Sequence, residues 1–386
     1  MPATSQEAAT QASLTGLISS YSFIELIQTV ENLKTASSFL LDHCFPNEVM
    51  SQAAEVAIDI DVGKRRMSPF VSPLVEGRPV ESRQFQTNLY VPPTVKDFRN
   101  PDLLKPLRRQ FGERIGGDVS LRNRVEENIR YEFADQIDML NRRCEWMAAQ
   151  ALTSGKVEVT GDGYESHVID YQRDPSLTIA LTGDAQWGRS GVSPTDDLSN
   201  WAIHVLQKSG SMPQEIYFSV SAWRNFVSDP KLRDYTFQRA LIDPRSEQIA
   251  LGGRLPKKGG IYMGPWDQFD LYLYADWYVD VMRNPDGSVM KDANGRPIEI
   301  ERPMIPEGTV ILSGPDLQGT RAYGVVQDPE FNYQPLAYAP KLWCQRNPGQ
   351  INMMMQSAPL MIPSRVNASM SISVCAPGNG ITGGTN

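Results

Sequence analysis

One helical pattern constrains the fold of this chain more than any other feature. Between Asp118 and Ser154, apolar side chains recur in steps of three and four residues, which places them on one face of a helix. The apolar positions are Leu121, Val125, Ile129, Phe133, Ile137, Leu140, Cys144, Met147 and Ala151. Asp118 is suited to the N-cap and Gly155 to the C′ position. Such a helix is about 50 Å long at 1.5 Å per residue, a length that is uncommon in compact enzymes.

A proline-rich hairpin is predicted between Glu55 and Val91. Apolar and polar residues alternate at both of its ends, which indicates strands, and the Glu76-Gly77 pair is predicted to turn the chain with Gly77 at positive φ. Prolines within and beside it cannot donate to a strand ladder, which excludes a central strand at those positions. A two-stranded ribbon is marginal on its own, so we expect it to lie on another surface.

The remaining elements are predicted from local patterns. Residues 1 to about 20 are rich in Ser, Thr, Ala and Gln and predict an arm, and an apolar stripe predicts a helix over 22–40. Thr195 or Asp196 is predicted to cap a helix that reaches Gly210. Further predictions are a hairpin at 156–170, a strand at 216–220, a helix at 222–227, two aromatic-rich strands at 261–279, an exposed hairpin at 283–303 and a strand at 306–313.

Composition excludes several classes of protein. The 386 residues carry a net charge of −8, which argues against wrapping nucleic acid through its phosphates. Four cysteines and three histidines are scattered without the spacing of a disulfide framework or a metal site. We therefore expect neither a metal nor a cofactor. No apolar run approaches the roughly 20 residues that cross a bilayer, and no basic start precedes an apolar core, so we expect no membrane partner and no secretory signal.

No catalytic set is predicted. The glycine-rich stretch 252–260 lacks the G-x-x-x-x-G-K-[ST] pattern of a phosphate-binding loop, and no G-x-S-x-G sequence exists. Two carboxylate pairs are better explained by structure than by catalysis. Asp59 and Asp61 are predicted on the polar side of a strand, and Asp196 and Asp197 at a helix N-terminus. Two basic groups are predicted to lie on solvated surface or to contact an acidic neighbouring subunit, in preference to binding DNA. They are Lys64-Arg65-Arg66 and the cluster Lys105, Arg108, Arg109 and Arg114.

The segment from Arg321 to Pro363 carries the most specific motifs. It holds an R-x-Y-G-x-x-Q-D turn ending at Asp328, a lysine-tryptophan strand beginning at Lys341, and the strand sequence QSAPLM at 356–361. With the S-P-x-V-x-G sequence at 72–77 and the P-T-D-D sequence at 194–197, this order resembles the lambda-type major capsid protein family of tailed phages, the E family. The resemblance covers roughly residues 55–375.

The resemblance implies an α+β fold of the HK97-like capsid type, with an N-terminal arm, an extended β-hairpin, a long spine helix, a peripheral-domain sheet and an axial domain. The implied division is an arm at 1–54, an extension loop at 55–111, a peripheral domain at 112–190, an axial domain at 191–337, and a return to the peripheral domain with the tail at 338–386. The peripheral sheet is expected to combine 156–190 with the strands after about 338.

By the same resemblance, the chain is a major capsid protein and not an enzyme. It is expected to self-assemble into hexamers and pentamers of an icosahedral phage head that encloses double-stranded DNA, with a scaffolding protein, a portal and a decoration protein as partners. Assembly is expected in the host cytoplasm and the final location in the virion. Candidate intersubunit residues lie in the extension loop: Arg65, Arg66, Glu76, Arg78, Glu81 and Arg83.

One alternative of another class remains open at this stage. The aromatic residues between 262 and 278 would line the groove of a soluble hydrolase-type enzyme, although core packing is the default at strand spacing. Size in solution separates the two readings, because a capsid protein forms capsomers or megadalton shells whereas an enzyme runs as a small oligomer.

Overall fold

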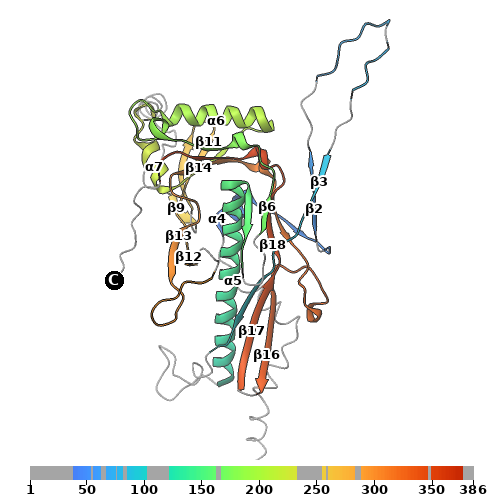
Figure 1. Cartoon of the computed structure of the whole chain (residues 1–386), viewed down its shortest axis with the longest axis vertical. Coiled ribbons are helices and arrows are strands. Elements are labelled where there is room, and N and C mark those ends of the chain that lie inside the picture. The colour runs from blue at the N-terminus through green and yellow to red at the C-terminus, as the bar shows by residue number, and fades with distance from the viewer. Residues whose placement is uncertain are drawn as a thin grey trace, which may run out of the picture.

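The computed structural model describes residues 38–53, 55–61, 67–74, 76–80, 85–101, 121–161, 167–232, 254–257, 260–282, 288–346 and 349–376. The predicted arm, nearly all of the predicted 22–40 helix, and the predicted cap Asp118 lie outside these residues. The described chain is built along one long helix, with sheets packed at both of its ends and a hairpin that projects from the body (Figure 1).

The long helix is α5, Leu121–Ser154, and its predicted apolar stripe is confirmed. Every stripe side chain that the structure describes, from Val125 to Ala151, is between 0% and 7% exposed. The helix ends where Gly155 takes φ +70°, a left-handed conformation that a glycine adopts without strain, and its N–H donates to the carbonyl of Ala151 at 3.1 Å.

A seven-stranded sheet lies across the C-terminal end of α5. Its spatial order is β7-β19-β14-β8-β11-β10-β9. The bounds are β7 Thr178–Ala180, β8 Glu215–Phe218, β9 Arg254–Lys257, β10 Gly260–Trp266, β11 Phe269–Tyr274, β14 Thr309–Ser313 and β19 Met370–Ser373. Helices α6 (Pro194–Ser209) and α7 (Val220–Val227) pack on one face. Helix α4 (Phe39–Cys44) and α5 pack on the other.

Strand alternation explains why the central strands of this sheet are apolar on both sides. In β8, Ile216 and Phe218 point into the core shared with α6 and α7, whereas Tyr217 points into the core shared with α4 and α5. In β14, Val310 and Ile311 divide between the two cores in the same way. A strand that is buried on both faces reads in sequence as a continuous apolar run.

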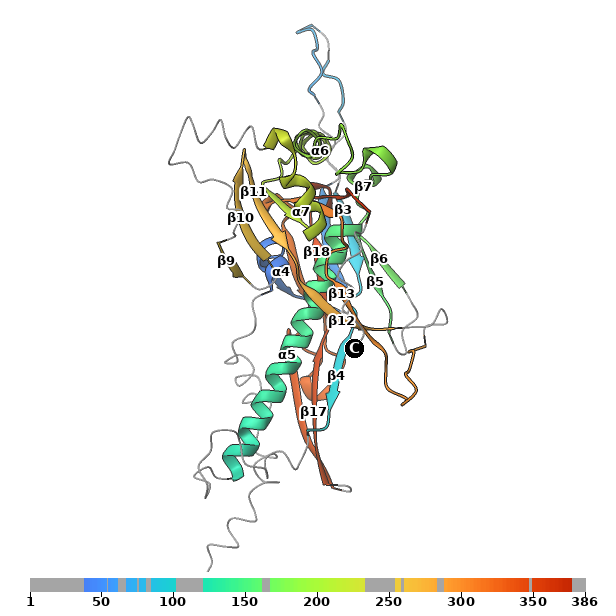
Figure 2. The ribbon, with the colours of Figure 1, turned by 90° about the vertical axis from the view of Figure 1, so that its left-hand side faces the viewer.

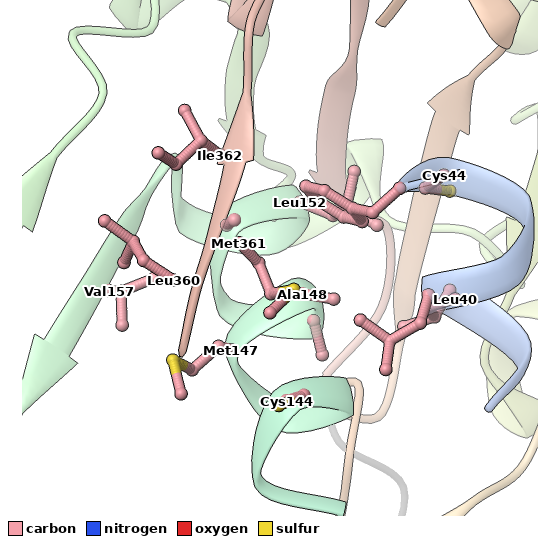
Figure 3. Close-up of a cluster of buried hydrophobic side chains, with 14 of the residues drawn as sticks. Leu40, Cys44, Cys144, Met147, Ala148, Leu152, Val157, Leu360, Met361 and Ile362 are labelled. Carbon is pink, nitrogen blue, oxygen red and sulfur yellow. The ribbon is translucent and has the colours of Figure 1, made fainter. Parts of the chain in front are cut away.

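Two three-stranded sheets line the flank of α5. One has the order β1-β15-β18, with β1 Asn47–Met50, β15 Gly319–Tyr323 and β18 Pro359–Pro363. Its strand β18 packs against the upper part of the helix, where Leu360 and Met361 meet Met147 and Ala148 (Figure 3). The other has the order β16-β17-β4, with β16 Ala339–Arg346, β17 Gly349–Ser357 and β4 Val95–Arg99. It packs against the lower part of α5 around Phe133.

Several local predictions are confirmed. The predicted hairpin forms from β5 (Lys156–Val159) and β6 (His167–Asp170), which pair antiparallel at four positions. Elements α6, β8 and α7 follow one another as expected. The predicted exposed hairpin at 283–303 is right only in part, because β13 (Glu299–Pro303) pairs with β12 (Trp277–Val281), which precedes the predicted range.

Other predictions are wrong in detail. The aromatic stretch 261–279 holds the start of a third strand, β12, because the chain leaves the large sheet after Tyr274. The C-terminal strands join 156–190 only in part, since β19 pairs with β7 in the seven-stranded sheet, whereas β16 and β17 pair with β4 and β18 pairs with β15. Neither Thr195 nor Asp196 caps α6, because both lie inside the helix and Ser193 holds the N-cap position.

Candidate assembly interface

The extension hairpin is anchored at its base and exposed beyond it. Strands β2 (Val56–Asp61) and β3 (Phe85–Tyr90) pair antiparallel over six positions, and the first pair, Val56 with Tyr90, is buried. Beyond the strands the loop projects away from the body (Figure 1). Its apolar side chains there meet no described part of the chain, since Met67, Phe70 and Leu74 are 87%, 102% and 96% exposed. A segment of this kind has few packing contacts of its own, so it is the first candidate for contact with another molecule.

The predicted turn of this loop is wrong. Gly77 does not take positive φ, and the chain bends instead at Pro73-Leu74, where the Leu74 N–H donates to the Ser72 hydroxyl at 3.5 Å. Proline presets the φ that the first central residue of a common turn requires. Pro73 therefore sets the bend of the loop, whereas the sequence had predicted that Gly77 would do so.

Two of the six candidate intersubunit residues lie in the described part of the loop. Glu76 and Arg78 are exposed, as an intersubunit role requires. Arg65, Arg66, Glu81 and Arg83 fall outside the residues whose side chains the structure describes. Their role therefore stays a prediction.

The segment after the arm is held by a buried carboxylate that the sequence analysis missed. Glu145 of α5 accepts hydrogen bonds from the backbone N–H groups of Leu40 (2.8 Å) and Leu41 (3.1 Å) and from the Tyr274 hydroxyl (2.9 Å). It thus caps the first turn of α4 and joins α4, α5 and β11 at one point. Burial raises the pKa of Glu145 to about 7, although its three donors act in the opposite direction.

A second buried charge caps the C-terminal end of the spine helix. Arg173 is 8% exposed and donates from its guanidinium to the carbonyl oxygens of Leu152 and Thr153, both at 2.6 Å, and to the Thr178 hydroxyl at 3.0 Å. These carbonyls belong to the last turn of α5, where a cation also meets the negative end of the helix dipole. Burial lowers the pKa of Arg173 to about 10, which leaves the group charged at neutral pH.

The C-terminal motif residues hold separate segments together and show no arrangement for catalysis. Arg321 donates to the carbonyl of Phe45 at 2.8 Å and to the carboxylate of Asp42 at 2.9 Å, which ties β15 to the chain around α4. Asp328 accepts from Lys341 at 3.1 Å and from Gln356 at 2.9 Å. The turn, the lysine-tryptophan strand and the QSAPLM strand therefore meet at one carboxylate.

The electrostatics of Asp328 follow from this contact. Burial raises its pKa, but hydrogen bonds from Gln356, the Glu330 N–H and Lys341 outweigh burial, so that the pKa is lowered overall. The carboxylate stays ionised and accepts from three protein donors, which suits a structural link between segments.

The aromatic groove of the enzyme alternative does not form. Trp266 and Phe269 are buried, and the Trp266 ring packs on Phe269 with centroids 5.8 Å apart and on Phe226 with centroids 5.6 Å apart. On the other face, Tyr272 stacks on Tyr217 at 5.5 Å. These rings fill the two cores of the large sheet, so they are packing residues.

The carboxylate pairs show no catalytic geometry either. Asp196 and Asp197 both lie in the first turn of α6, as expected, where Asp196 pairs with Lys231 and Asp197 accepts from the Trp187 ring N–H at 3.0 Å. The side chains of Asp59 and Asp61 are outside the described set. No group of His, Cys, Asp and Glu suited to a metal occurs among the described residues. Over the same residues, no helix is long and apolar enough to cross a membrane.

Comparison with known proteins agrees with this architecture. The chain is 24% identical to the major capsid protein of Escherichia phage lambda over 313 residues, which are 78% of this chain and 83% of that one. It is 23% identical to the major capsid protein of Enterobacteria phage P21 over 346 residues, 88% and 94% of the two chains. Its fold is similar to a crystal structure of the putative capsid protein of a prophage of E. coli CFT073, with a TM-score of 0.64 at 16% identity over 92% of this chain and 99% of that one.

Spine helix, projecting hairpin and large sheet together define an α+β protein of the HK97-like capsid type. Residues 22–374 match the family described as phage major capsid protein E, and the chain belongs to that family. It is a capsid-forming structural protein of the virion and not an enzyme.

Proposed function

We propose that this chain assembles into hexamers and pentamers that close an icosahedral phage head around double-stranded DNA. The observation that carries the proposal is the projecting extension loop. Its apolar side chains Phe70 and Leu74 are almost fully exposed in the single chain, whereas both cores of the body are closed. Burying such a loop requires a neighbouring copy, and repetition of one such contact around a ring builds a capsomer.

The proposed domain division follows the family resemblance. The extension loop takes 55–111, the peripheral domain 112–190 with 338–386, and the axial domain 191–337, after an arm at 1–54. The seven-stranded sheet crosses this proposed division, because β7 and β19 lie in the peripheral ranges while the other five strands lie in the axial range.

Further partners are proposed from the same resemblance. A scaffolding protein would set shell curvature during assembly in the host cytoplasm, a portal would occupy one vertex, and a decoration protein would bind the closed shell. The DNA would be enclosed without sequence-specific contacts, in keeping with the net charge of −8.

Co-expression with the scaffolding protein of the same phage tests the proposal. Sedimentation of the lysate followed by negative-stain microscopy should show closed shells of uniform diameter. Protein that remains a small oligomer at every concentration, with its scaffold present, contradicts the proposal.

A further inference from the structure

The ribbon formed by β12 and β13 has one face that contacts the body through Tyr278 and one face without such a contact among the described hydrogen bonds. The pairing Trp277↔Pro303, Val279↔Glu301 and Val281↔Glu299 places these side chains on one face of the ribbon. On that face Trp277 is 41% and Val279 is 58% exposed. We call Trp277, Val279, Val281, Glu299 and Glu301 the ribbon face.

The opposite side of the ribbon faces the spine helix at Tyr278 and is partly exposed beyond it. Tyr278 accepts a hydrogen bond from the ring N–H of Trp146 in α5 at 3.2 Å, and Arg302 pairs with Asp280 at 3.3 Å. Arg302, the one cation of this side within β12 and β13, is therefore on the face opposite to Glu299 and Glu301. Among the described residues, neither glutamate makes an ion pair.

A ribbon of this composition needs a cover. Two strands with one solvated face are marginally stable in water. Exposure of the apolar row Trp277, Val279 and Val281 to water is also unfavourable. A suitable cover would bring apolar side chains to Trp277 and Val279 and positive charge to Glu299 and Glu301.

We infer that the ribbon face receives the tip of the extension loop of a second copy of this chain. The inference rests on the proposed intersubunit role of that loop and names the surface to which it binds. The tip offers Phe70 and Leu74 as apolar side chains and Arg78 as an exposed cation.

Charge complementarity supports this match. Residues 62–84 hold five Lys and Arg residues against two Glu residues, a net charge of +3, in a chain whose net charge is −8. The loop is thus cationic in an acidic protein, and it is attracted to acidic surfaces of its neighbours. The ribbon face combines two carboxylates with the apolar row Trp277, Val279 and Val281.

The placement of the two surfaces also fits a ring. The extension hairpin and the ribbon lie on opposite sides of α5 (Figure 1), and turning the molecule by 90° brings the ribbon to the viewer (Figure 2). A head-to-tail ring joins one side of each copy to the opposite side of the next, so a loop on one side meets a receptor on the other.

Cysteine pairs test the contact directly. Leu74→Cys with Val279→Cys, in a Cys344→Ala background, leaves three native cysteines that are all buried. Shells assembled with scaffold and treated with a short bismaleimide should give a ladder of linked chains on a denaturing gel. The matched control pairs Leu74→Cys with Tyr131→Cys, because Tyr131 is 65% exposed on α5 and offers a competing acceptor.

The outcomes separate this inference from the proposed function. A ladder from the Val279 pair and not from the Tyr131 pair supports the ribbon face. A ladder from the Tyr131 pair alone overturns the ribbon face but keeps the loop as an intersubunit element. Absence of shells from the unmodified chain with its scaffold would overturn the proposed function itself.

Charge exchange provides a second test. Glu299→Arg with Glu301→Arg should lower shell yield on the order of tenfold, and adding Arg78→Glu should restore part of it, because the signs again become complementary. Circular dichroism of the unassembled variants controls for folding. Normal yield from the doubly reversed ribbon overturns the inference.

Discussion

At the scale of single residues, the described body is joined by buried charges placed at helix ends. Glu145 binds the first turn of α4 and Arg173 binds the last turn of α5, so each charge meets unpaired backbone groups and the favourable end of a helix dipole. Both groups lie at the joint between the spine and the large sheet. Substitution of either group should therefore change the free energy of unfolding of the whole chain.

Glu145 gives this protein a specific pH dependence. Its pKa of about 7 lies above the ordinary value of 4.5, so between these values the folded state holds a proton that the unfolded state releases. The contribution of this group is fully present below pH 4.5 and is lost as pH rises to about 7, a change of up to about 3 kcal/mol in the free energy of unfolding. Denaturant midpoints at pH 5 and pH 7.5 should therefore differ more for the unmodified chain than for Glu145→Gln. If the midpoint changes equally between the two pH values in the unmodified chain and in Glu145→Gln, the pKa assigned to Glu145 is wrong. The matched control is Glu158→Gln, because Glu158 is exposed.

Gly319 is the second residue where a small change should be costly. A Cβ at this position would overlap the backbone carbonyl oxygen of Cys44 and lie 2.7 Å from a ring carbon of Phe45. Backbone cannot retract as a flexible side chain does, so we expect Gly319→Ala to lower the free energy of unfolding by about 1–3 kcal/mol. Gly77→Ala is the control, because no atom lies within 4 Å of its Cβ position. A thermal melt compares the two, and similar midpoints would show that the close approach at Gly319 is relaxed in solution.

At the scale of elements, the spine helix carries the strongest sequence signal and the clearest test. Ile129 lies in the buried stripe at 4% exposure, and Tyr131 lies on the same helix at 65%. Ile129→Pro removes a backbone hydrogen bond and costs about 3 kcal/mol or more, in addition to the lost packing, so we expect insoluble protein. Tyr131→Ala should change stability by about 0.5 kcal/mol or less. Soluble Ile129→Pro that still assembles would refute the role of α5 as a continuous spine.

The elements also show what local sequence can and cannot predict. The α5 stripe and the β5–β6 hairpin follow local periodicity, and both were predictable. The seven-stranded sheet was not, because β7 and β19 join it through partners far away in sequence, and no local pattern encodes a partner. The start of α6 was misjudged for a related reason: Asp229, 34 residues away from Thr195, supplies its cap by accepting from the Thr195 N–H at 3.1 Å.

The candidate interface was only partly predictable as well. The prolines and exposed charges of the extension loop indicated a segment without a core of its own, which the exposure of Phe70 and Leu74 agrees with. Glu145 was missed because it follows Cys144 at the edge of the apolar stripe, where a charged residue usually faces solvent. Its burial depends on α4 and β11 arriving from distant parts of the chain.

At the scale of the whole molecule, folding and assembly draw on different surfaces. The base of the extension loop contributes Val56 and Tyr90 to one core, but the part of the loop between β2 and β3 joins neither the two cores nor the lower-spine cluster and is exposed where the structure describes it. Changes in the loop should therefore leave the fold of the single chain intact. They should act only where one copy meets the next.

Reversing the loop's charge separates these two roles. Arg78→Glu with Arg83→Glu should keep a cooperative melt and native-like circular dichroism. Arg78 is exposed and the sequence predicts the same of Arg83, and exposed substitutions change the free energy of unfolding by about 0.5 kcal/mol or less. Shells should fail to close, since charge complementarity between subunits sets register and excludes wrong contacts. Sedimentation of protein co-expressed with scaffold measures closure, and Arg130→Glu with Arg142→Glu on the exposed side of α5 gives a control of equal charge change. Normal shells from the loop variant would show that the loop is not needed between subunits. Loss of its cooperative melt would show that the loop is needed for folding of the single chain.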